Sequence, residues 1–158
     1  KQGVYNSNTV VNVKVQMAAP VTVVDVLSGK VIPSTFANGW TSFQTEIARL
    51  KGKLIAFYPV LPTTVQIELP SVTSGKSALL KASILAGGNK ISSPFPLYVE
   101  LLDPNGKQHP YTRYVATDAQ GEYQLPIVIG TNAPKGTWKV QVTELSTGIK
   151  NSKMFDLK

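Results

Sequence analysis

The sequence of 158 residues contains no cysteine, so disulfide bonds and thiolate metal ligands are excluded. Small secreted eukaryotic domains more often carry disulfides, whereas many bacterial exported domains have none and rely on the size of their core. The absence therefore favours a bacterial protein that is exported to the periplasm, the cell surface or the extracellular space.

Histidine is nearly absent as well. His109, the single histidine, stands between Gln108 and Pro110 in a predicted loop, with no second histidine or cysteine to complete a metal site or a nucleophilic dyad. No serine lies in a Gly-x-Ser-x-Gly motif, and no glycine-rich segment follows a strand and opens a helix. We expect His109 to be a solvated loop residue, and the sequence predicts no metal and no cofactor.

Long hydrophobic runs are missing too. No window approaches the ~18 consecutive apolar residues of a membrane-spanning helix, and no basic amphipathic helix is present to bind a membrane surface. The sequence therefore predicts no membrane insertion. Its first residue is lysine and no signal-peptide pattern follows, which indicates a processed or excised piece of a longer chain.

Arginine is scarce although the chain is basic. The 16 Lys and Arg outnumber the 9 Asp and Glu and give a formal charge of +7, which by itself would suit an anionic partner. Only Arg49 and Arg113 are arginines, and they are far apart in sequence. Because arginine makes most bidentate contacts to phosphates and bases, the sequence predicts a soluble, lysine-rich surface and no nucleic-acid partner.

The dominant pattern that is present is the alternation of apolar and polar residues, which predicts half-buried strands. It is clearest over 96–102, 122–129 and 137–144, which are separated by turn-forming segments at 103–106, 118–121 and 133–136. Further strands are predicted at 65–69, 77–85, 111–117 and 149–157. Roughly seven strands in about 95 residues are typical of an immunoglobulin-like sandwich.

The first part of the chain also reads as β-structure. Strands are predicted over 9–16, 21–27 and 31–32, followed by a loop over 33–40. The segment 41–51 fits both helical and strand spacing; we favour a strand, because the apolar run 53–58 needs an antiparallel neighbour.

Prolines at 59 and 62 then interrupt the pattern, and prolines do not continue a central strand. We therefore predict two domains, 1–62 and 63–158. The predicted fold class is all-β, with two consecutive antiparallel β-sandwiches.

The second half of the chain, 63–158, resembles macroglobulin-like and bacterial immunoglobulin-like domains. The resemblance is carried by Asp103-Pro104-Asn105-Gly106, Thr117-Asp118-Ala119-Gln120-Gly121 and Gly136-Thr137-Trp138. The segments 24–30, 43–50 and 52–58 are similar to the small all-β domain that follows the catalytic barrel in many bacterial glycoside hydrolases. Together the two resemblances imply the C-terminal accessory region of an exported glycosidase-like protein, whose partners are neighbouring domains of the same polypeptide.

The carboxylates offer no catalytic pair. Asp103 opens a turn, where its side chain is expected to bond the local backbone, and Asp118 with Glu122 suits a hairpin turn better than a calcium loop. Asp25 lies in an apolar strand and is expected to be paired by Lys30 or a backbone amide. The sequence therefore predicts no enzyme activity.

Aromatic side chains are the remaining candidates for ligand binding. Trp138 alternates with core valines and is expected to be buried, whereas Trp40, and secondarily Tyr111 and Tyr114, are candidates for stacking on a sugar. We expect a non-catalytic accessory module that acts as a spacer or interaction domain. The alternative is a carbohydrate-binding module with an aromatic platform around Trp40, for which a polysaccharide would be the partner.

Overall fold

The computed structural model describes residues 8–48 and 51–157. Within these ranges the regular structure consists of fourteen strands in four antiparallel sheets, which confirms the predicted all-β class. The chain divides into two compact units, Lys1–Leu61 and Pro62–Lys158, hereafter unit 1 and unit 2. The division lies within the proline-containing segment that suggested a domain boundary.

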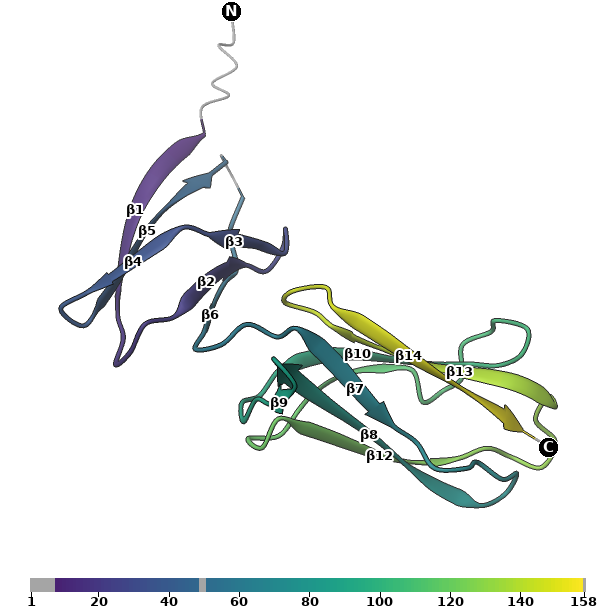
Figure 1. Cartoon of the computed structure of the whole chain (residues 1–158). Coiled ribbons are helices and arrows are strands. Elements are labelled where there is room, and N and C mark those ends of the chain that lie inside the picture. Colours follow the sequence, from purple (N-terminus) through teal and green to yellow (C-terminus); the bar gives the residue numbers. More distant parts are fainter. Residues whose placement is uncertain (1–7, 49–50, 158) are drawn as a thin grey trace, which may run out of the picture. The chain divides into compact units, whose positions relative to one another are not determined.

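Unit 1 contains two three-stranded sheets (Figure 1). One has the order β1 (Thr9–Gln16), β5 (Trp40–Ile47), β4 (Ser34–Ala37), and the other β3 (Lys30–Ile32), β2 (Thr22–Asp25), β6 (Ile55–Tyr58). Val23 and Val24 of β2 are buried, and the rings of Phe43 in β5 and Phe57 in β6 meet edge to face at 6.1 Å. This aromatic contact joins the two sheets into one core.

The strand favoured for 41–51 is confirmed over β5, and residues 49–50 lie outside the described part of the chain. Thr41, Phe43 and Thr45 are buried while the residues between them are not, which is the two-residue period of a strand rather than the spacing of a helix.

The loop predicted over 33–40 is wrong, because Ser34–Ala37 form β4 and pair with β5. Asn38 and Gly39 make the connecting turn, and both have positive φ, 52° and 77°. An Asn-Gly pair with positive φ at both positions is the favoured two-residue connection of a hairpin. The turn residues that suggested a loop therefore connect two strands.

Unit 2 is a sandwich of two antiparallel sheets (Figure 1). The first has the order β11 (Arg113–Ala116), β10 (Pro96–Leu102), β13 (Gly136–Glu144), β14 (Lys150–Leu157). The second has the order β12 (Glu122–Val128), β8 (Ser77–Ala86), β7 (Thr64–Glu68), and the short β9 (Asn89–Lys90) pairs with the end of β8. This arrangement agrees with the predicted immunoglobulin-like sandwich.

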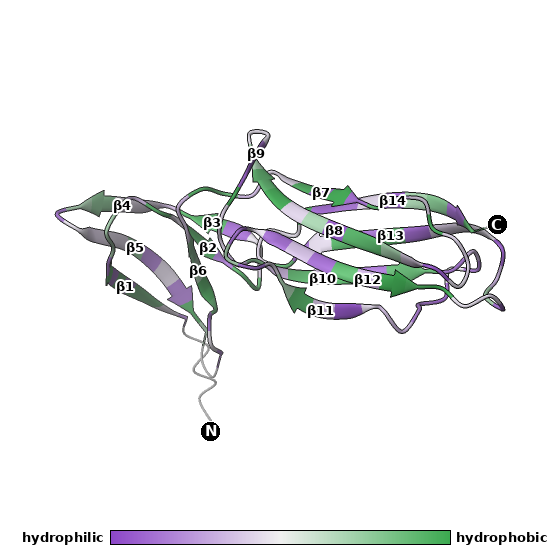
Figure 2. Cartoon of the chain, turned by 90° about the horizontal axis from the view of Figure 1, so that it is seen from below, coloured by the Kyte–Doolittle hydropathy of each residue, from purple (hydrophilic) through white to green (hydrophobic). Residues whose placement is uncertain are grey.

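The core of unit 2 follows from the alternation of residues along its strands. Leu97, Val99 and Leu101 of β10 are buried while the residues between them are not, and Figure 2 shows hydrophilic residues interspersed with hydrophobic ones along the strands. Trp138 is 1% exposed, as expected, and its indole N–H donates a hydrogen bond to the carbonyl of Pro134 at 3.0 Å. The other face of each strand is left for solvent or for a partner.

Candidate functional site

The three predicted ligand residues lie in both units: Trp40 in unit 1, and Tyr111 and Tyr114 in unit 2. The two tyrosines do not pair with each other. The ring of Tyr114 stacks on that of Tyr98 with centroids 4.6 Å apart, whereas the ring of Tyr111 stacks on His109 at 5.2 Å. Trp40, Tyr111 and Tyr114 therefore lie among different neighbouring residues.

Tyr111 is engaged in holding a loop of unit 2. Its hydroxyl oxygen accepts a hydrogen bond from the backbone N–H of Val128 in β12 at 3.1 Å, and the Arg113 guanidinium lies 5.7 Å from its ring centroid. The side chain thus ties the segment before β11 to the opposite sheet. This contact gives Tyr111 a structural role whether or not a ligand binds nearby.

His109 is not the solvated residue that the sequence suggested. Its side chain is half-buried, and its ring meets that of Trp138 at 5.7 Å in addition to stacking on Tyr111. Burial lowers the pKa of the imidazole, against a smaller opposing effect of the Asp103 carboxylate. The neutral ring anchors the loop between β10 and β11 onto the core.

Trp40 begins β5 rather than lying in a loop, and 44% of its surface is exposed. Because side chains alternate along a strand, it shares the outer face of sheet β1-β5-β4 with Ser42 and Gln44. The register adds Gln16 beside Trp40, and Lys14 beside Ser42. We call this surface the Trp40 face.

A hollow of about 600 Å³ lies against the Trp40 face. The Gln44 amide donates a hydrogen bond to Oδ1 of Asn12 at 2.8 Å on the same face. The hollow is lined mainly by polar residues together with Val13, Pro33 and Phe43: Asn12, Lys14, Ser34, Thr35, Ser42 and Gln44. Amides, hydroxyls and one ammonium group near an exposed indole can supply hydrogen bonds and stacking to a polar ring-shaped ligand.

A second polar and aromatic surface lies on the outer face of sheet β11-β10-β13-β14 in unit 2. Tyr98 stands opposite Tyr114 of β11, and Glu100 stands opposite Gln141 of β13. Gln108, from the loop after β10, donates its amide to the Tyr98 hydroxyl at 3.2 Å and to Oε1 of Glu100 at 3.1 Å. We call this surface the tyrosine face.

Four residues of the tyrosine face were not among the predicted site residues: Tyr98, Glu100, Gln108 and Gln141. A signal for two of them is present in the sequence, because Leu97, Val99 and Leu101 form the buried face of β10 and therefore turn Tyr98 and Glu100 outward. Nothing in the sequence places Gln108 or Gln141 beside them, since their meeting depends on the loop conformation and on the strand register.

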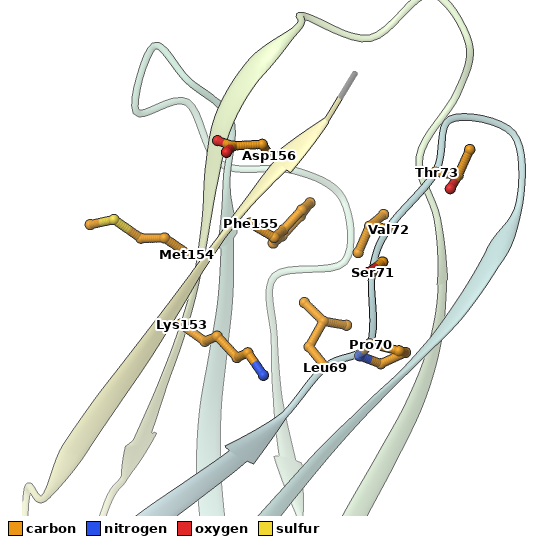
Figure 3. A pocket seen from close by; sticks show the side chains of 9 residues that line it. All are labelled: Leu69, Pro70, Ser71, Val72, Thr73, Lys153, Met154, Phe155 and Asp156. Atoms are coloured by element: carbon orange, nitrogen blue, oxygen red, sulfur yellow. The ribbon is translucent and has the colours of Figure 1, made fainter.

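A groove of about 520 Å³ lies between β14 and the segment that follows β7, and Figure 3 shows the side chains that line it. Leu69, Val72 and Phe155 line it with apolar side chains, and Met154 points away from it. The charged residues at the groove are Lys153 and Asp156, and Oδ1 of Asp156 accepts a hydrogen bond from the Thr137 hydroxyl at 2.7 Å. The groove marks the place where β14 runs beside the opposite layer of the sandwich.

Asp25 is paired with Lys53, and not with Lys30, which the sequence suggested as an alternative to a backbone amide. The Lys53 ammonium donates a hydrogen bond to Oδ2 of Asp25 at 2.8 Å. This bond lowers the pKa of Asp25 below its usual value of 3.8, although burial acts in the opposite direction. The second carboxylate oxygen, Oδ1, is buried without a hydrogen-bond partner in the described part of the chain.

Asp103 bonds the local backbone, as predicted, and Asp118 does the same in its hairpin turn. Oδ1 of Asp103 accepts the N–H groups of Asn105 and Lys107, at 2.8 and 2.9 Å. Oδ1 of Asp118 accepts those of Gln120 and Glu122, both at 2.9 Å. These bonds close the two turns locally.

Other carboxylates have structural partners as well. Glu122 lies 3.3 Å from the ammonium of Lys90 and 3.8 Å from that of Lys81. Glu144 is buried and accepts the N–H groups of Ser146 and Thr147, both at 2.8 Å. Across residues 8–48 and 51–157, no three histidine or acidic side chains gather as they would around a metal ion.

A comparison of the chain with protein-family models finds no match, and a comparison with curated protein sequences finds no relative. The described residues contain no helix with the length and hydrophobicity that a membrane crossing requires.

Proposed function

We propose that the chain is a non-catalytic accessory module of an exported bacterial multidomain protein, either glycosidase-like or attached to the cell surface. It acts as a spacer or interaction domain for neighbouring domains of the same polypeptide. The observation that carries the proposal is the use of its acidic side chains. Asp103, Asp118 and Glu144 each accept two backbone N–H groups that close a turn or a loop.

This use of carboxylates supports a structural role. Sugar hydrolysis requires two carboxyl groups that face each other about 5 to 9.5 Å apart across a cleft. Acidic groups that hold turns are oriented by the backbone and serve stability instead. The resemblance to accessory β-domains of glycoside hydrolases points to the same role, and an exported setting agrees with the lack of cysteine.

The experiment that tests this proposal begins with the complete polypeptide to which the segment belongs. The purified segment and the remainder of that polypeptide are mixed, and their association is followed by calorimetry. We expect binding, or an increase in the melting temperature of the neighbouring domain. Turnover of a chromogenic glycoside by the segment alone would contradict the proposal, and so would a parent chain with no further domain.

A second candidate function is carbohydrate binding through the Trp40 face. It is favoured by a hollow lined in part by amide and hydroxyl groups, on the same sheet face as an indole that is 44% exposed. Affinity electrophoresis against soluble polysaccharides tests it, with Trp40→Ala as the variant and Leu27→Ala, an exposed residue of the same unit, as the control. Retardation that persists in Trp40→Ala would contradict this assignment.

A further inference from the structure

We propose that the tyrosine face of unit 2 is a binding site for a neutral glycan. The face combines two stacked aromatic rings with three polar side chains that hold one another in place: Tyr98, Tyr114, Glu100, Gln108 and Gln141. This site is separate from the Trp40 face and does not depend on the accessory role.

The aromatic part is accessible to a ligand. Tyr114 is 73% exposed although its ring stacks on Tyr98, with an angle of 29° between the ring planes. A cross-strand aromatic pair by itself stabilises a sheet, so the pair alone does not indicate a site. It does leave aromatic surface open on which the C–H groups of a sugar ring can pack.

The polar part gives the surface its specificity. The Gln108 amide bridges the Tyr98 hydroxyl and Oε1 of Glu100, and the Gln141 amide donates to Oε2 of Glu100 at 3.0 Å. The amide groups therefore fix the carboxylate beside the aromatic pair. A carboxylate oxygen has more than one lone pair, so Glu100 retains acceptor capacity for hydroxyl groups of a ligand.

The surroundings of Glu100 favour a neutral glycan, although Lys139 and Lys150 lie further along the same sheet face. In the described part of the chain no lysine or arginine forms an ion pair with it, and its hydrogen-bond donors are neutral amides. A sugar hydroxyl can donate a charge-assisted hydrogen bond to such a carboxylate, whereas a uronate or sulfate group would be repelled by it. The site therefore suits a neutral sugar.

The strand register indicates how far the site extends. Thr143 stands beside Tyr98 and Ser152 beside Gln141, so hydroxyl groups continue the face across β13 and β14. Lys150, opposite Thr143, marks its edge on β14. Four strands about 4.8 Å apart give a surface roughly 14 Å wide, which matches a short stretch of a polysaccharide better than a single sugar.

The test is affinity electrophoresis of the full chain in gels that contain a neutral or an acidic polysaccharide. The neutral probes are mixed-linkage β-glucan, xylan and galactomannan, and the acidic probes are polygalacturonate and alginate. The variants are Tyr114→Ala and Glu100→Gln. Trp40→Ala reports on the other candidate face. The controls are Leu27→Ala, an exposed residue of unit 1, and Leu79→Ala, a partly exposed residue on the opposite sheet of unit 2.

We expect at least one neutral polysaccharide to retard the wild-type chain. Tyr114→Ala should weaken this binding by about tenfold or more, as for an aromatic contact at the centre of a site. Glu100→Gln should weaken it too, because the charge-assisted acceptor is lost. Both controls should bind like the wild type, and circular dichroism should show that all variants are folded.

Three outcomes would overturn the proposal. The first is the absence of retardation by every neutral probe, and the second is retardation by the acidic probes alone. The third is binding that is lost in Trp40→Ala but kept in Tyr114→Ala, which would assign the sugar to the Trp40 face. The third outcome leaves carbohydrate binding by unit 1 intact, so the two proposals fail separately.

Discussion

At the scale of single residues, the buried Asp25 carboxylate is held by the partly exposed Lys53 ammonium through only one of its two oxygens. One carboxylate oxygen receives the Lys53 ammonium at 2.8 Å, while the other is buried without a hydrogen-bond partner in the described residues. Removing Lys53 would therefore leave a buried charge with little compensation. This is the situation in which a single ion pair matters for stability.

We expect Lys53→Met to lower the free energy of unfolding by about 1–2 kcal/mol at pH 7, less than for a fully buried pair because Lys53 is partly exposed. The pKa of Asp25 is lowered in the folded state, so the contribution of the pair is fully present above the unfolded pKa of about 3.9. It is lost as the pH falls through the folded pKa.

Urea denaturation at pH 7 and at successively lower pH values below 4 measures this contribution. The difference between the wild type and Lys53→Met should shrink in the acidic range. Lys81→Met, which removes a weaker and more exposed pair with Glu122, serves as the control and should change stability much less than Lys53→Met. A difference that is constant with pH would contradict the assignment.

Gly121 is a second residue whose identity the fold requires. Its φ is +73°, and a Cβ at this position would lie 1.8 Å from the carbonyl oxygen of Ile91. We expect Gly121→Ala to destabilise the chain by about 2–4 kcal/mol, through backbone strain and the clash together. Chemical denaturation measures the change.

The matched control is Gly87→Ala. Gly87 also has a positive φ, +55°, but a Cβ there would meet no atom within 4 Å. Gly87→Ala should lower the free energy of unfolding by only about 1 kcal/mol, because it adds strain in the left-handed backbone region but no clash. Equal decreases in the free energy of unfolding of the two variants would show that the clash at Gly121 is relieved by movement of the neighbouring segment.

At the scale of elements, most strands could be predicted because a strand that is buried on one face alternates residue by residue. The alternation is visible in β10, β13 and β5. β4 was missed because its four residues are all exposed, so no alternation marks them. Its presence depends on the Asn38-Gly39 turn and on pairing with β5.

Because β4 depends on its turn, changing the turn residues should weaken it. Replacing Asn38 and Gly39 by alanine should weaken the hairpin by about 1–2 kcal/mol, because both positions need positive φ. Amide hydrogen exchange of residues 34–37 should speed up, while exchange in unit 2 should stay unchanged. Uniform acceleration across the chain would instead indicate a global loss of stability.

At the scale of the whole molecule, each unit has its own sheets and its own buried residues. The buried residues of unit 2 include Trp138, Phe95 and Leu80, which come from both of its sheets or from the segment leading into them. A domain with its own core can fold alone. The two units are therefore expected to be separable.

We predict that the fragment Pro62–Lys158 folds without unit 1. It should show a near-ultraviolet circular dichroism signal from Trp138 and a single cooperative unfolding transition in urea. The same fragment carrying Gly121→Ala serves as a reference with a lower free energy of unfolding. A fragment that lacks a cooperative transition would show that the core of unit 2 depends on residues of unit 1.

By itself, the sequence determined those features that depend on neighbouring residues along the chain. These are the strands, the burial of Trp138 and the turns closed by Asp103 and Asp118, because alternation and side-chain bonds to nearby N–H groups act over a few residues. The outward direction of Tyr98 could be deduced in the same way. Trp40 and Tyr114 could be identified as exposed aromatic candidates, but the sequence did not predict which residues lie beside them.

Only the tertiary structure decided which distant residues meet. Lys53 pairs with Asp25 across 28 residues, and Gln141 reaches Glu100 across 41. Tyr114 stacks on Tyr98 rather than on Tyr111 because the register of β10 and β11 places them opposite each other. The physical reason is that strand order and register are set by the packing of a whole sandwich, whereas the alternation along each strand specifies only its buried face.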